Sequence, residues 1–294
     1  MTAVHGSTKL KPGEIRIAAN GIEFAALTAG QPGRLVLCLH GFPDNAWTFR
    51  FQFEALVNGG YHVVAPFLRG YYPTPPSADG RFGIGDLAQD ALSIIQALGY
   101  KSATIFGHDW GALAGYAAAV SAPNLIERLV TAAVPYGPSI MEAFVGDFEQ
   151  QRRSWYMFFF LTPFAELALA HDDFRFIELL WRSWSPLWEI PRDHLELVKD
   201  TFRKPGVASA ALAYYRQALL PNSPGTVPPL GKISVPTLTF FGSHDGCIGP
   251  YLFDGMEAFF DEQALRKVCV RGAGHFVHLE APALVNEELL RFLD

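Results

Sequence analysis

The segment from Ala103 to Gly115 passes from an apolar, strand-like run into an alanine-rich, helix-like run. At the junction, Gly107-His-Asp-Trp-Gly111 places a glycine two positions before and two positions after Asp109. Small residues at these two positions permit a sharp turn that holds the central side chain clear of a sheet. An aspartate that merely caps a helix N-terminus is the alternative. The spacing alone does not decide between a nucleophile and a cap.

Short apolar runs alternate with helical patterns in the first half of the chain, and the alternation returns near its end. This pattern predicts an α/β fold, a mostly parallel sheet with helices on both faces. The expected strands are Ile22–Thr28, Leu35–His40, His62–Phe67, Ser102–Gly107, Leu129–Val134, Thr237–Gly242 and Lys267–Gly272. The expected helices are Trp47–Asn58, Gly85–Leu98, Trp110–Ser121 and Pro282–Leu293.

The middle of the chain contains no convincing strand. From Tyr136 to Pro228 it shows only helical segments rich in aromatic residues, and a proline-rich stretch at 221–229 ends it. We therefore expect an all-helical cap at 136–228, inserted into a core domain formed by 1–135 and 229–294.

Charge and hydropathy exclude several classes of function. The net charge is −6 and no Lys/Arg cluster is present, which argues against binding to nucleic acid or to an anionic membrane. No apolar run approaches the roughly 18–20 residues that span a bilayer. The first dozen residues lack the apolar core of a secretory signal.

The three cysteines, Cys38, Cys247 and Cys269, do not have the spacing of a metal site. Cys38 and Cys269 fall in apolar strand-like runs, where a buried free thiol is expected. Together with the absence of a signal, these thiols indicate a cytoplasmic location.

An aspartate nucleophile needs different chemistry from a serine. Its carboxylate is ionised at neutral pH, with a reference pKa of about 3.9, and it can displace a leaving group at saturated carbon. Water must then hydrolyse the resulting ester. In His40-Gly-Phe-Pro-Asp44, the amide of Phe42 is placed to form an oxyanion hole together with the amide of Trp110. A simple turn before a helix capped by Asp44 or Asn45 is compatible with the same residues.

The ester step requires a base and an orienting acid, and both are expected after late strands. His275 follows the last expected strand and is the candidate base, whereas His278 is expected to pack or to start a helix. Asp245 follows Phe240-Phe-Gly-Ser-His and would fix the tautomer of His275. His244 beside Asp245 offers only two metal ligands, so no metal is expected. The chemistry requires no organic cofactor.

The elbow around Asp109, the segment His40-Gly-Phe-Pro and the chain order Asp109, Asp245, His275 resemble the α/β-hydrolase fold superfamily. Two further segments, 153–163 and 212–217, resemble the cap segments of epoxide hydrolases, which carry paired tyrosines. In the first, the tyrosine seven residues before a proline is Tyr156; in the second, the pattern aromatic-Tyr-Arg selects Tyr215 over Tyr214.

The resemblance implies a hydrolase that converts an epoxide to a vicinal diol and thereby detoxifies it. Tyr156 and Tyr215 would act as acids, since a phenol can protonate the epoxide oxygen while staying neutral at pH 7. Aromatic packing within a helical cap is the simpler interpretation of either tyrosine. Trp110, Met157 and Phe276, with Phe42, are expected to line an apolar pocket for a small apolar epoxide. A homodimer is left open.

Other families with the same elbow differ at identifiable positions. Haloalkane dehalogenases usually place Asn or another side-chain donor where this chain has Phe42. Haloacetate dehalogenases place Arg where this chain has Trp110, and a His-Trp pair where it has Tyr156-Met157. A dehalogenase of the same fold is the main alternative; an ordinary esterase and a non-catalytic ligand-binding protein are others.

The chain also departs from the epoxide hydrolase pattern in one loop. The family's Arg-Gly-Tyr-Gly loop has Tyr72 here for its last glycine, and Phe67 where Asp is common.

Overall fold

Eight strands form a single sheet in the computed structural model, which describes residues 10–220, 223–225 and 230–294. The order across the sheet is β1-β2-β4-β3-β5-β6-β7-β8. β2 is antiparallel to β1 and β4, and every pairing from β4 to β8 is parallel. The strands are β1 (Gly13–Ala19), β2 (Ile22–Ala29), β3 (Arg34–Leu39), β4 (Tyr61–Pro66), β5 (Ala103–His108), β6 (Ile126–Ala132), β7 (Thr237–Gly242) and β8 (Leu265–Val270).

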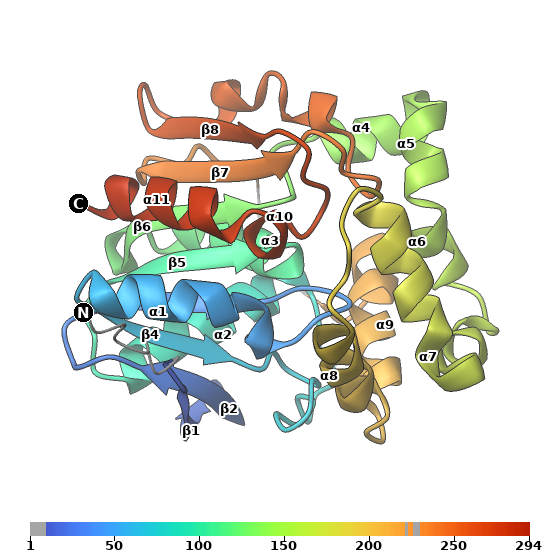
Figure 1. Ribbon diagram of the computed structural model, residues 1–294, viewed down its shortest axis with the longest axis horizontal. Coiled ribbons are helices and arrows are strands. Elements are labelled where there is room, and N and C mark those ends of the chain that lie inside the picture. Colours follow the sequence, from blue (N-terminus) through green and yellow to red (C-terminus); the bar gives the residue numbers. More distant parts are fainter. Residues whose placement is uncertain (1–9, 221–222, 226–229) are drawn as a thin grey trace, which may run out of the picture.

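Helices cover both faces of this sheet. The helices α1 and α11 pack together on one face, and α2 and α3 lie on the other (Figure 1). These helices are α1 (Arg50–Asn58), α2 (Ile84–Ala97), α3 (Trp110–Ser121) and α11 (Pro282–Leu293), with the short α10 (Val277–Glu280) before α11. Four 3-10 helices complete the core: η1 (Ala46–Phe49), η2 (Pro123–Leu125), η3 (Pro250–Phe253) and η4 (Met256–Phe259).

The described residues between β6 and β7 form six further helices. They are α4 (Ser139–Gly146), α5 (Phe148–Arg153), α6 (Trp155–Phe159), α7 (Ala165–Trp184), α8 (Arg192–Phe202) and α9 (Val207–Leu219). We call this group the helical insertion. It lies beyond the carboxyl ends of the parallel strands (Figure 1), the edge of an α/β sheet at which ligands usually bind. Among the described residues, no helix combines the length and the apolarity needed to cross a membrane.

The sequence predicts most of these elements. Each expected strand overlaps an observed one, and Trp110–Ser121 and Pro282–Leu293 are observed with the expected bounds. The expected strands do not include β1, an antiparallel edge strand in which the exposed Glu14 and Arg16 alternate with Ile15 and Ile17. The expected strands are near-continuous apolar runs, and this alternating pattern is of the other, half-exposed type. The expected boundary at 228/229 lies outside the described residues.

One prediction about the cysteines is wrong. Cys38 is a buried free thiol in the central strand β3, as expected, but Cys269 is exposed. β8 is the last strand of the sheet, and most of its residues are partly or fully exposed. An apolar run predicts a strand, but it does not show which face of an edge strand remains open to solvent.

The loop after β4 is held by a buried ion pair. Arg69 makes a bidentate pair with Asp90 of α2, with two nitrogen–oxygen distances of 2.6 Å, and both side chains are almost completely buried. Asn20 adds a third hydrogen bond to the Asp90 carboxylate at 2.7 Å. The arginine of the loop is therefore fixed even though the loop has Phe67 and Tyr72 in place of the usual Asp and Gly.

Replacing Asp90 with alanine is expected to lower the free energy of unfolding by about 3–5 kcal/mol, because it leaves the Arg69 charge buried without its partner. Urea unfolding of the purified variant measures this loss. Asp261→Ala removes an exposed carboxylate and should leave the unfolding midpoint nearly unchanged. An equal effect of both substitutions would contradict a special role for the buried pair.

Candidate active site

Asp109 sits between β5 and α3 with φ 52° and ψ −115°, a conformation that L-residues rarely adopt. The flanking glycines allow this turn. A Cβ atom on Gly107 would overlap the backbone of Gly111, and one on Gly111 would overlap the carbonyl oxygen of Leu39. The glycine spacing seen in the sequence is therefore a steric requirement of the turn.

The two oxygens of the Asp109 carboxylate have different surroundings. Oδ1 accepts a hydrogen bond of 2.7 Å from the backbone N–H of Phe42, while Oδ2 lies 3.8 Å from Nε2 of His275. Trp110 is the first residue of α3, and the amide of a first helical residue has no partner within its helix. The structure places the amide of Phe42 on the Asp109 carboxylate, and the oxyanion roles of Phe42 and Trp110 both stay predictions.

His275 and Asp245 come from the loops that follow the adjacent strands β8 and β7. Nδ1–H of His275 donates to Oδ2 of Asp245 at 3.0 Å. The other oxygen of Asp245 accepts the amides of Cys247 and Ile248 at 2.7 and 2.9 Å. This arrangement fixes the tautomer and turns Nε2 toward Asp109. Among the described residues, Nε2 has no hydrogen-bond partner although it is buried.

The surrounding charges prepare His275 to hold a proton. Burial acts to lower its pKa, but Asp245, Cys247, the hydrogen bond with Asp245 and the nearby carboxylate of Asp109 together raise the pKa well above its usual value. Formation of an ester on Asp109 would remove that carboxylate charge and hence one cause of the rise. A larger fraction of the imidazole is then neutral and free to accept a proton from water.

Asp245→Asn is expected to move the acidic limb of ester hydrolysis to lower pH. The carboxylate is among the groups that raise the pKa of His275, so its loss lets the neutral imidazole persist in more acidic solution. The maximal rate should also fall, since the tautomer is no longer fixed. Single-turnover rates across the pH range measure both effects. A limb that stays in place or moves to higher pH would contradict this assignment.

The end of α7 fastens these loops to the helical insertion. The carbonyl oxygen of Trp184 accepts the amides of His275 and Gly246, at 3.1 and 3.0 Å. Oγ of Ser185 also accepts the amide of His275 at 3.1 Å. The insertion therefore contributes to the position of the candidate base as well as covering it.

Tyr156 of α6 and Tyr215 of α9 are both buried, and their ring centroids lie 5.8 Å apart. The hydroxyl of Tyr156 lies 3.2 Å from Sγ of Cys247, and Tyr215 packs edge-on against Trp110 at 5.0 Å. Burial is the main cause that raises the pKa of each tyrosine well above its usual value, and the nearby charge of Asp109 adds to it. Both phenols therefore remain neutral and able to donate.

The neighbouring Tyr214 has a different role. Its hydroxyl donates to the carbonyl oxygen of Arg69 at 2.8 Å. The hydroxyl of Tyr215 is also buried, but it has no hydrogen-bond partner among the described residues. An unsatisfied buried hydroxyl is costly unless a ligand completes it, so the geometry favours Tyr215 over Tyr214 as a donor to substrate.

Aromatic rings close the site. The ring of Phe42 contacts four rings of the insertion, with centroid distances from 5.2 to 6.4 Å: Phe160, Trp184, Phe202 and Tyr215. Phe276 is fully buried and stacks on Trp181 at 3.9 Å, beside His275. Met157 is half-buried on α6, next to Tyr156. Contact of these residues with a substrate remains a prediction.

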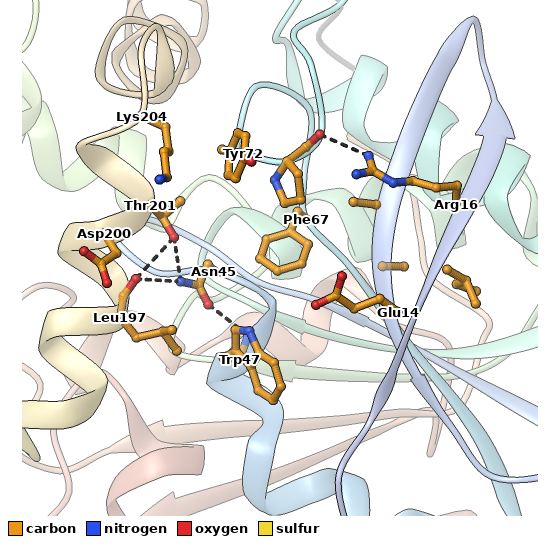
Figure 2. A pocket seen from close by; sticks show the side chains of 14 residues that line it. Glu14, Arg16, Asn45, Trp47, Phe67, Tyr72, Leu197, Asp200, Thr201 and Lys204 are labelled. Atoms are coloured by element: carbon orange, nitrogen blue, oxygen red, sulfur yellow. Dashed lines mark hydrogen bonds between the residues drawn. The ribbon is translucent and has the colours of Figure 1, made fainter.

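A separate pocket of about 530 Å³ lies between the first two strands and α8 (Figure 2). Asn45 forms part of its wall, where its amide donates to Thr201 and its side-chain oxygen accepts the amide of Trp47. Asn45 thus caps η1, while Asp44 is buried beside His194. The side chains of Asp109, Asp245 and His275 do not line this pocket, so it is not the candidate active site.

The fold and this site now permit comparison with known proteins. Residues 34–282 match the family described as the alpha/beta hydrolase fold. The chain belongs to that family. An epoxide hydrolase from Caballeronia sordidicola is 30% identical over 95% of this chain and 93% of its own. Mouse epoxide hydrolase 3 is 29% identical over 94% of this chain and 75% of its own. Within the family, the chain therefore belongs with the epoxide hydrolases.

A solved structure supports the same placement. The crystal structure of Bacillus megaterium epoxide hydrolase in complex with an inhibitor is 27% identical. It matches with a TM-score of 0.83 over 95% of this chain and 99% of that one.

One residue of the site is not singled out by the sequence. The sequence does not mark Cys247 as functional, because its spacing from the other cysteines is not that of a metal site. In the structure its sulfur nevertheless lies among Asp245, His275 and Tyr156. The only signal is its position two residues after the orienting acid. Because Asp245 accepts the amide of Cys247, the loop turns back toward the site at this residue.

Proposed function

We propose that this hydrolase opens an epoxide to a vicinal diol through a covalent ester on Asp109. The observation that carries the proposal is the environment of the carboxylate: one oxygen on a backbone amide, the other facing a histidine, and two neutral buried tyrosines close enough for its charge to raise their pKa. The two neutral tyrosines suit an epoxide substrate, because opening of the epoxide ring creates a basic alkoxide that must be protonated.

In the first step, Oδ2 of Asp109 attacks an epoxide carbon, and a carbon–oxygen bond of the ring breaks. Tyr156 and Tyr215 bind the ring oxygen, and one of them gives it a proton. Oδ1 stays on the amide of Phe42 and becomes the carbonyl oxygen of the ester. No charge has to move to a metal or an organic cofactor in this scheme.

In the second step, Nε2 of His275 takes a proton from water as the water attacks the ester carbon. Asp245 stabilises the imidazolium through its bond of 3.0 Å. The developing oxyanion rests on the amide of Phe42, aided by that of Trp110. Collapse of this intermediate breaks the bond between the ester carbon and the diol oxygen, which takes up the proton of the added hydroxyl group. The proton held by His275 returns to the tyrosinate left by the first step, and release of the diol leaves one water oxygen in the carboxylate of Asp109.

A single turnover of styrene oxide in oxygen-18 water tests the covalent route. The diol of the first turnover should be unlabelled, because its new oxygen comes from Asp109, and peptide mass analysis should find one label in that carboxylate. Label in the first diol, with none in the protein, would show direct attack by water and rule the proposal out.

Several wider expectations belong to this proposal. We infer that α4–α9 form a cap unit over a core built from the two chain ends, and that the natural substrate is a small apolar epoxide. We also propose a cytoplasmic location, because all three cysteines are free, and a role in detoxification. A homodimer stays open until the mass of the native protein is measured.

A further inference from the structure

Three buried groups meet beside the candidate nucleophile. Asp245, Cys247 and His275 each turn one carboxylate, sulfur or ring-nitrogen atom inward, and these atoms all lie within 4.8 Å of one another. All three residues are at most 1% exposed. They come from the two loops that follow β7 and β8, whose parallel pairing brings the loops together.

These donors are the ligand types that thiophilic divalent cations prefer. A thiolate, an imidazole and a carboxylate suit zinc and the still softer cadmium, rather than magnesium or calcium. Zinc bonds of about 2.0–2.3 Å place tetrahedral ligands roughly 3.3–3.8 Å apart. Since the donors lie within 4.8 Å of one another, no pair has to close by more than about an ångström. The hydroxyl of Tyr156, 3.2 Å from Sγ of Cys247, or a water would complete four ligands.

The loop that carries Cys247 is held firmly in place. The side chain of Gln150 spans it, donating to the carbonyl oxygen of Cys247 and accepting the amide of Gly249, each at 2.9 Å. The amides of Cys247 and Ile248 bond to the Asp245 carboxylate. Such outer contacts orient ligands before a cation arrives and lower the cost of binding.

We propose that Asp245, Cys247 and His275 form an inhibitory site for a thiophilic divalent cation such as Zn²⁺. A cation on either ring nitrogen of His275 prevents the imidazole from activating water. Its bond to Sγ of Cys247 also replaces the contact between that sulfur and the hydroxyl of Tyr156. Cation binding and turnover then exclude each other. The inhibitory part rests on the proposed function, whereas cation binding itself does not.

Cadmium titration tests the site directly, because a cadmium–thiolate bond absorbs in the ultraviolet. The exposed Cys269 is first replaced with serine to remove an unrelated thiol, and this C269S protein should keep its activity. It is expected to develop the thiolate band with one equivalent of Cd²⁺, and the C247S/C269S variant should not. Because C247S could alter folding, X-ray absorption of Zn²⁺-loaded C269S gives a second readout, expected to show one sulfur and at least one nitrogen at bonding distance.

Inhibition is measured on the same proteins, each relative to its own rate in chelator-treated buffer. Zn²⁺ should inhibit C269S at least tenfold more tightly than C247S/C269S, and chelation should restore the rate. Equal inhibition of both proteins, or a zinc shell without sulfur, would overturn the site. If C269S binds Cd²⁺ but never forms diol, the proposed function fails and the cation site stands. If C269S forms diol but develops no thiolate band, the cation site fails and the proposed function stands.

Discussion

The Asp109→Ala variant is expected to lose diol formation, with kcat reduced by about 10⁴-fold or more. The reason is covalent: without the carboxylate no ester can form. Steady-state assays with styrene oxide measure the loss. Circular dichroism and thermal unfolding establish that the variant is folded.

Two variants make this result specific. Asp254→Ala removes an exposed carboxylate and should retain full activity. His275→Gln should still form the ester but not hydrolyse it, so that intact mass analysis after incubation shows the protein heavier by one substrate molecule. A near-normal rate in Asp109→Ala, or no adduct in His275→Gln, would contradict the two-step scheme.

The second large effect is expected for Tyr156→Phe combined with Tyr215→Phe. A positioned acid typically contributes 10²–10⁴-fold, so loss of both hydroxyls should slow epoxide opening by about 10⁴-fold. Each single variant should retain part of the activity through the remaining tyrosine. The decisive measurement is the rate of ester formation, because ester hydrolysis does not use these hydroxyls.

The same double variant separates epoxide hydrolysis from dehalogenation. Halide release needs no proton, so a dehalogenase would tolerate both substitutions and would release halide from haloalkanes at an undiminished rate. Tyr214→Phe is the matched control from the same helix. It loses the bond to the carbonyl oxygen of Arg69, which should cost about 1 kcal/mol of stability but leave catalysis intact.

Local sequence patterns predict the parts of the site that depend on strand ends. The elbow around Asp109 follows from glycine spacing after an apolar strand, and the pairing of Asp245 with His275 follows because adjacent parallel strands end at the same edge. The two tyrosines of the helical insertion cannot be predicted from such local patterns. An aromatic residue in a helix has the same local pattern whether it packs or donates, so Tyr156 and Tyr215 are selected only through a family resemblance.

Other features depend on tertiary packing that the sequence does not reveal. The inward turn of Cys247 is set by amide bonds to Asp245, and the exposure of Cys269 depends on β8 being the last strand. The strand β1 differs from the expected strands because exposed and buried residues alternate along it, so it has no continuous apolar run. In each case the local run of residue types is compatible with more than one environment.

The position of Phe42 links substrate entry to reactivity. Its amide holds the nucleophile, and its ring is wedged among four rings of the insertion. A movement of the insertion that frees this ring is expected also to loosen the amide bonded to Asp109. In such an open state the hydrogen bond from the Phe42 amide to Asp109 would be weaker, and it would re-form only when the insertion closes. If the helical insertion moves in this way during turnover, bulky substrates that keep it away from the ring of Phe42 should react slowly even when they bind well.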